Sequence, residues 1–184
     1  MKQHQLIYKI VLTAIFASLC YVLTTFVSIP IFGGSGYINF SDAFVFSLAF
    51  LINPVVGGLA GGIASMLSDL TLGYTQYAVF SLIIKFLEAN VAYLICYLMS
   101  KKGGFNYVKA MISMVIAGFF MAGCYLIPDW ITYASGIDTS LSALLLTNFA
   151  FNSLQGLVNS CIALVLLRAM YPLFHKDKKG KTNL

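Results

Sequence analysis

Charged residues are scarce in this sequence. Asp, Glu, Lys and Arg make up 9% of its 184 residues, whereas a soluble domain averages about 25%. Hydrophobic residues make up 60%. A globule of this size cannot hide that much apolar surface, because about a third of its unfolded-chain surface stays wet. The shortage of charge excludes a soluble domain and a disordered chain, and it favours a single integral membrane domain over residues 1–184.

Cysteine and histidine are few and dispersed. The four cysteines stand alone in different apolar runs, with no CxxC motif and no Cys/His cluster. We therefore expect neither a zinc site nor a disulfide framework, and no cofactor. The two histidines, His4 and His175, lie in the polar termini. An intramembrane hydrolase needs paired carboxylates or an activated nucleophile, and Asp69 and Glu88 are the one plausible pair.

Apolar segments separated by Gly, Pro and polar breaks fill most of the chain. We predict an all-α bundle of six transmembrane helices at residues 10–29, 42–52, 55–72, 77–99, 110–127 and 141–171. The first can span about 30 Å of hydrocarbon, and it lacks a small-residue cleavage site, so we expect it to be retained. Pro128 is expected to end the fifth helix. Because the second segment is short, a four-helix alternative folds segments two and three into one re-entrant hairpin.

The basic residues predict the orientation in the membrane. With the N-terminus inside, ten of the 11 Lys and Arg residues fall at cytoplasmic ends and none in the three outer loops, as the positive-inside rule requires. We therefore predict that both termini are cytoplasmic, with Asp129 and Asp138 in outer loops. Basic residues at the ends of apolar segments fit the surface of a lipid bilayer, and we expect no nucleic acid partner.

Four ionisable residues fall at membrane depth. Lys85 and Glu88 lie three positions apart in the fourth segment, Asp69 lies near the outer end of the third, and Asp42 begins the second. Each charge costs about 2.5–3.5 kcal/mol on insertion scales, so these residues should face the interior and find partners. Either Lys85 pairs with Glu88 or Asp69 and locks segments three and four, or one of them contacts a polar ligand. For Asp42 we favour a helix N-cap.

The sixth segment carries a stripe of amide side chains. Asn148, Asn152, Gln155 and Asn159 follow spacings of four, three and four, so they share one helical face. Amides that face lipid are costly, and we expect these to face inward. They can bond to neighbouring helices or bind an uncharged heterocycle through their donors and acceptors. We favour ligand binding for the outer pair, Asn148 and Asn152.

Aromatic and small residues mark two further faces. Aromatic side chains crowd the predicted outer side as an interfacial belt or as a stacking wall for a flat ring, and we favour Tyr37, Tyr74 and Tyr77 for the wall. Small residues repeat at i,i+4 in Ala14 and Ser18 and among the glycines of residues 57–62, which lets helices approach closely. We expect the third segment to pack within the chain and the first to offer a face to another subunit.

The stretch over residues 37–89 holds four motifs in a fixed order. It begins with N-F-S-D, continues with N-P-V-x-G-G-L-A-G-G and S-D-L-x-x-G-Y, and ends with I-I-K-F-L-E. This order resembles the substrate-binding (S) component of an energy-coupling factor (ECF) vitamin transporter, most of all the members assigned to hydroxymethylpyrimidine or pyridoxine. Ala14 and Ser18 are similar to the alanine pair on which S components dock to the transmembrane scaffold (T) subunit.

The resemblance implies a multi-pass protein of the bacterial plasma membrane. It would bind a vitamin from outside and deliver it through the scaffold subunit and two ATP-binding subunits. The chain has no G-x-x-x-x-G-K-[ST] motif, and we expect a transport subunit rather than an enzyme. The candidate ligand-binding residues are Asn148, Asn152, Gln155, Tyr37, Tyr74, Tyr77, Lys85, Glu88 and Asp69. The alternatives are a structural or regulatory membrane protein without a ligand, and an intramembrane hydrolase.

Overall fold

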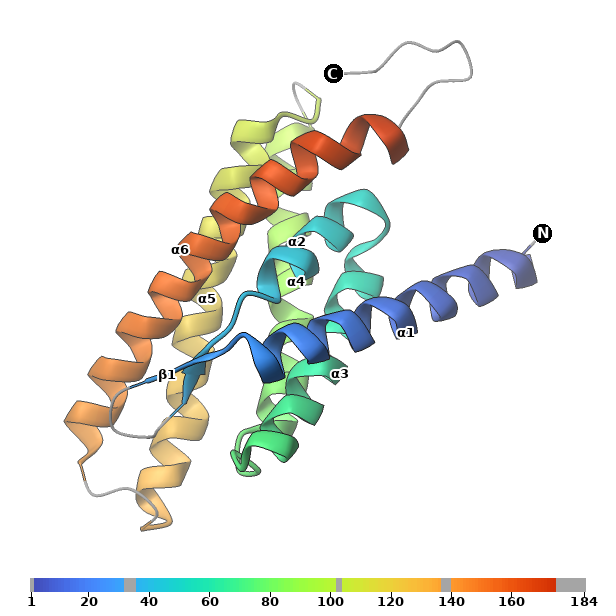
Figure 1. Cartoon of the computed structure of the whole chain (residues 1–184). Coiled ribbons are helices and arrows are strands. Elements are labelled where there is room, and N and C mark those ends of the chain that lie inside the picture. Colours follow the sequence, from blue (N-terminus) through green and yellow to red (C-terminus); the bar gives the residue numbers. More distant parts are fainter. Residues whose placement is uncertain (1, 32–35, 102–103, 137–139, 175–184) are drawn as a thin grey trace, which may run out of the picture.

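The computed structural model describes residues 2–31, 36–101, 104–136 and 140–174. Within these ranges the chain forms six helices and a small antiparallel hairpin (Figure 1). The elements are α1 (Lys2–Phe26), β1 (Ile29–Pro30), β2 (Tyr37–Ile38), α2 (Asp42–Leu51), α3 (Pro54–Leu72), α4 (Ala78–Ser100), α5 (Tyr107–Ala134) and α6 (Leu141–Phe174). The all-α class is confirmed, and the hairpin was not predicted. Phe32 of the predicted outer aromatic belt, Lys102 of the predicted cytoplasmic basic residues, the predicted outer-loop Asp138 and the tail beyond residue 174 lie outside the described residues.

Five of these helices are long and apolar enough to cross a membrane, and α2 is not. Its 10 residues extend about 15 Å, half of a hydrocarbon core of about 30 Å. Every residue of α2 except the half-buried Phe44 is buried, and the helix packs against α3, α4 and α6. Helix α1 begins, and α6 ends, at one end of the bundle, while the hairpin and the α3–α4 turn lie at the other (Figure 1). We call this second end the hairpin end.

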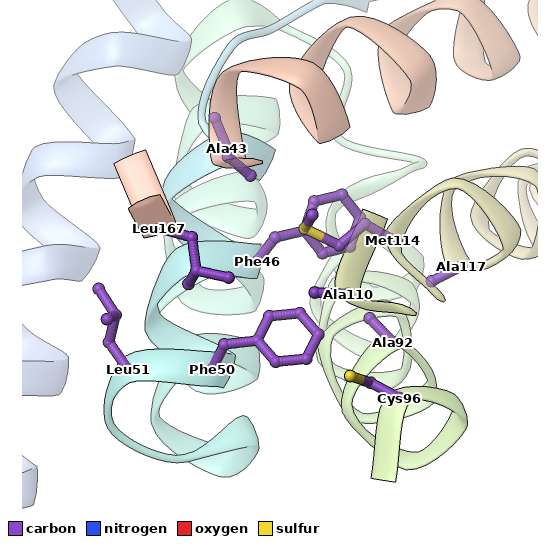
Figure 2. Close-up of a cluster of buried hydrophobic side chains, with 11 residues drawn as sticks. Ala43, Phe46, Phe50, Leu51, Ala92, Cys96, Ala110, Met114, Ala117 and Leu167 are labelled. Carbon is purple, nitrogen blue, oxygen red and sulfur yellow. The ribbon is translucent and has the colours of Figure 1, made fainter. Parts of the chain in front are cut away.

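The apolar core lies between α2, α4, α5 and α6. Figure 2 shows Phe46 and Phe50 of α2 pointing into a cluster that includes Met114 of α5 and Leu167 of α6. Phe46, Met114 and Leu167 are fully buried. This cluster packs the end of the bundle opposite the hairpin, and it leaves the polar side chains of the same helices to gather nearer the hairpin end.

Helix α3 owes its position to its ends and its glycines. Asn53 caps it by accepting a bond from Val55 N at 2.9 Å, and Gly73, with φ of 89°, ends it. A Cβ atom on Gly57 would lie 2.6 Å from the Val45 carbonyl oxygen of α2, and one on Gly62 would lie 2.6 Å from a carbonyl oxygen of α4. The prediction that this segment packs within the chain is therefore confirmed.

The prediction that Pro128 ends the fifth helix is wrong. Helix α5 continues through Pro128 to Ala134, and the Thr132 hydroxyl donates to the Pro128 carbonyl at 2.8 Å. Proline is tolerated within membrane helices because neighbouring helices and Thr side chains satisfy the freed backbone groups. Asp129 consequently lies on a helix and is 1% exposed, instead of standing in an outer loop as predicted.

Candidate functional site

A polar cavity of about 50 Å³ lies near the hairpin end of the bundle. The β-hairpin, the chain that follows it and helices α3, α4, α5 and α6 all contribute to its wall. The residues that line it are Ile31, Gly36, Tyr37, Asn39, Ser65, Asp69, Tyr74, Tyr77, Ser81, Tyr125, Asp129, Asn148, Asn152 and Gln155. This lining, as far as the structure describes it, contains two carboxylates, four tyrosines and no Lys, Arg or His.

Most of the residues predicted from the sequence are brought together in this wall. The seven that line it are Tyr37, Asp69, Tyr74, Tyr77, Asn148, Asn152 and Gln155. Lys85 and Glu88 do not line it. The sequence predictions missed five polar lining residues, which are Asn39, Ser65, Ser81, Tyr125 and Asp129. Serines and single polar residues in apolar helices give no periodic signal, so their position depends on how each helix is rotated in the bundle.

The two carboxylates of the cavity are each held by a tyrosine hydroxyl. Tyr37 donates to Asp69 Oδ1 at 2.7 Å, and Tyr77 donates to Asp129 Oδ1 at 2.9 Å. Burial, followed by the nearby Asp69 carboxylate, raises the pKa of Tyr37 far above its ordinary value, so this phenol remains a donor at any physiological pH. The Tyr37 ring also lies 5.4 Å from the Tyr74 ring, tilted by 51°, and the two form an aromatic wall.

The amide stripe of α6 divides into two halves with different surroundings. Toward the hairpin end, Asn148 donates to Asp129 Oδ1 at 2.9 Å, and Asn152 lines the cavity with no hydrogen bond to any described residue. Farther along, Asn159 accepts from Ala43 N at 3.1 Å and donates to the Asn39 carbonyl at 2.9 Å. Asn159 therefore satisfies a first-turn N–H of α2 and a carbonyl of the non-helical segment before it, because backbone groups without partners are costly at membrane depth.

Gln155 belongs to both halves. It lines the cavity, its carbonyl oxygen accepts from Asn39 N at 2.9 Å, and its amide nitrogen donates to Asp42 Oδ2 at 2.6 Å. Its amide is thus fixed on both sides by the segment that leads into α2. The inward direction of the stripe agrees with the sequence prediction. The sequence did not predict which of its residues line the cavity and which bond to the backbone near α2.

The predicted pairing of Lys85 with Glu88 is confirmed, and two other predictions about the buried charges are corrected. Lys85 pairs with Asp42 at 2.7 Å and with Glu88 at 3.2 Å, and it does not pair with Asp69. The ion pair therefore locks α2 to α4 instead of α3 to α4. Asp42 is not an N-cap, because Ser41 precedes the helix and Asp42 binds Lys85 and Gln155 through its side chain. Lys85 Nζ lies 5.9 Å from the centre of the Tyr125 ring, behind the cavity wall.

A second hollow lies on the outside of the bundle between α1 and α3. It has a volume of about 820 Å³ and a largely apolar lining that includes Ala14 and Ser18. Both residues are exposed, and the Ser18 hydroxyl donates to the Ala14 carbonyl at 2.9 Å. That bond satisfies the Ser18 hydroxyl within its own helix. The small-residue face of α1 is consequently apolar, concave and uncovered by the described part of the chain.

Comparison with known proteins gives a consistent result. Residues 4–172 match the family model described as ECF-type riboflavin transporter, S component. An uncharacterised protein of Pyrococcus woesei is 36% identical over 115 residues, which span 62% of this chain and 74% of that protein. The thiamine precursor transporter HmpT of Lactococcus lactis subsp. cremoris is 33% identical over 116 residues, spanning 62% of this chain and 66% of HmpT.

A solved structure shares the fold. The S component of a bacterial ECF transporter superposes with a TM-score of 0.64 at 19% sequence identity, and the match covers 90% of this chain and 96% of that one. At this identity the likeness concerns the arrangement of the helices.

Proposed function

Because this chain belongs to the S components of ECF-type transporters, we propose that it is the vitamin-binding subunit of an importer in the cell membrane. Its ligand is a small heteroaromatic molecule of the hydroxymethylpyrimidine or pyridoxine type, taken from outside. The observation that carries this proposal is the polar, tyrosine-lined cavity at the hairpin end, where Asn152 presents an amide that bonds to no described residue.

A small single-ring ligand fits this cavity better than riboflavin, which the matching family model names. The volume of about 50 Å³ is smaller than a cavity of roughly 150 Å³ that holds benzene, so even one ring requires part of the wall to move. Tyr74 is the wall residue that we expect to move, since its hydroxyl is held only by a long hydrogen bond of 3.5 Å to the Gly36 carbonyl. The thiamine precursor named for the Lactococcus relative also supports a single ring.

The proposal assigns six crossings to the chain, with both termini in the cytoplasm. Helix α1 begins and α6 ends at one end of the bundle (Figure 1), which agrees with an even number of crossings. In this arrangement α2 and the non-helical residues before it make the second crossing inside the protein, where Gln155 and Asn159 satisfy the backbone. The cavity then opens toward the outside.

Replacing Asn152 by Leu tests the binding site. We expect the affinity for hydroxymethylpyrimidine to fall more than about tenfold, because a ligand group would lose its amide partner in a buried site. Isothermal titration of the purified protein in detergent measures this.

Asn90→Leu is the matched control, since Asn90 bonds the Phe86 carbonyl of its own helix and does not line the cavity. Equal affinities of Asn152→Leu and wild type would remove Asn152 from the site. Wild-type protein that binds no vitamin or precursor would favour the structural alternative.

The groove between α1 and α3 is the proposed docking face for the T subunit, through which two ATP-binding subunits drive release. Ala14→Trp should fill this groove and reduce co-purification of the T subunit at least about tenfold, because overpacking a small-residue contact separates the helices. Ligand affinity should not change. Ile15→Trp is the control, since Ile15 is exposed on α1 and lies outside the groove. Equal losses of the T subunit in both variants would contradict this docking face.

A further inference from the structure

Ser65 and Asp69 form a pair of polar groups on the cavity face of α3. They are four residues apart and so lie one above the other on the helix. Both line the cavity, and they are 2% and 3% exposed. Ser65 Oγ and Asp69 Oδ2 are buried, and neither atom makes a hydrogen bond with a described residue. The Ser81 hydroxyl of α4 also interacts with the Asp69 carboxylate.

This pair differs from the other polar residues of helix α3. Ser68 shares a bond of 3.3 Å with Thr25 of α1, and Thr71 bonds Tyr21 of α1 at 3.0 Å. These two residues hold α3 to its neighbour. Since buried polar groups almost always have hydrogen-bond partners, an unpartnered donor and an unpartnered acceptor side by side in a cavity wall indicate the place of a ligand.

The Asp69 carboxylate is held in place for this task. Tyr37 donates to its Oδ1 atom at 2.7 Å, which leaves Oδ2 as an acceptor of fixed direction. The Ser65 hydroxyl can donate one hydrogen bond. Together the two side chains offer one acceptor next to one donor, and the complementary ligand edge presents an N–H donor next to a lone-pair acceptor.

We propose that Ser65 and Asp69 recognise an exocyclic amino group and the ring nitrogen beside it, in the ligand of the function proposed above. Asp69 Oδ2 accepts from the amino N–H, and Ser65 Oγ donates to the ring nitrogen. Hydroxymethylpyrimidine has this edge, whereas pyridoxine lacks the amino group. The pair therefore selects the aminopyrimidine over the pyridine vitamin, and it makes the amino group the main determinant of specificity.

The test combines ligand and protein changes in one cycle. Wild-type protein in detergent is titrated with hydroxymethylpyrimidine, with its analogue lacking the amino group, and with pyridoxine. Wild-type affinity should fall about 100-fold for the analogue and for pyridoxine, since a site built to bind a polar group rejects ligands without it. Asp69→Asn should weaken hydroxymethylpyrimidine binding by a similar factor and change binding of the analogue by less than about threefold.

Serine variants supply the second arm. Ser65→Ala should weaken hydroxymethylpyrimidine binding roughly tenfold, as expected for one neutral hydrogen bond. Ser68→Ala, on the same helix but outside the cavity lining, should not weaken it. Wild-type protein that binds the analogue or pyridoxine as tightly as hydroxymethylpyrimidine would overturn the pair's role and leave the proposed function intact. Wild-type protein that binds none of the three would overturn both. The wild-type arm gives this answer even if Asp69→Asn does not fold.

Discussion

Replacing Lys85 by Met is expected to lower the free energy of unfolding by about 3–5 kcal/mol, the cost of leaving buried charges without a partner. Lys85 Nζ lies 2.7 Å from Asp42 Oδ2 and 3.2 Å from Glu88 Oε2. None of the three residues is more than 1% exposed. Methionine preserves the apolar stem and removes the charge, so two carboxylates remain without a cation inside the bundle. Unfolding of the purified variants in one detergent measures the loss.

Two comparisons isolate the charge effect at Lys85. Lys101→Met removes an exposed lysine at the end of the same helix, and its effect should stay within about 0.5 kcal/mol. Adding Glu88→Gln to Lys85→Met should recover part of the loss, because one of the two uncompensated carboxylates becomes neutral. A Lys85→Met protein with wild-type stability but without ligand affinity would contradict this. It would support the alternative prediction from the sequence, that one of the buried charged residues contacts the ligand.

The direction of the site-forming side chains could be predicted because it follows from local periodicity. The amide stripe of α6 faces inward as expected, since spacings of four and three define a helical face without knowledge of the rest of the fold. Tyr37, Tyr74 and Tyr77 were identified by their position beside loops, and all three line the cavity. These features depend on a few neighbouring residues in the sequence.

The partners of these side chains could not be predicted, because they depend on where helices distant in sequence come to lie. Lys85 and Asp42 are 43 positions apart, and their pairing requires α2 to be enclosed within the bundle. The position of Asp42 at the start of the segment favoured an N-cap, but its side chain instead pairs with Lys85 of a distant helix. Asp129 was missed for a different reason. Pro128 indicates a helix end in a soluble protein, but here packing carries the helix past it.

The contact between α5 and α6 was not predicted either. Gly118 and Ala122, and Gly156 and Ser160, are small-residue pairs at i,i+4, but such a pair does not say which distant helix it meets. A Cβ atom on Gly118 would lie 2.8 Å from the Gly156 Cα atom, so the two helix backbones touch at this point. Nearer the hairpin end, the same two helices contribute Tyr125 and Asn152 to the lining of the cavity. We therefore expect the distance between the two helices at this crossing to affect the shape of the cavity.

Gly118→Ala should accordingly destabilise the protein by about 1–3 kcal/mol, the usual cost of overpacking a close contact, and should also weaken ligand binding. Gly123→Ala is a matched control on the same helix, because a Cβ atom there meets nothing within 4 Å. That control gains the same helix propensity, about 0.5–1 kcal/mol for Gly to Ala, without the clash. Measurements of unfolding and of ligand binding on the two variants separate the effect of the helix contact from the effect of helix propensity. A Gly118→Ala protein as stable and as tightly binding as Gly123→Ala would show that the helices can part at this point without cost, and that their contact does not set the shape of the cavity.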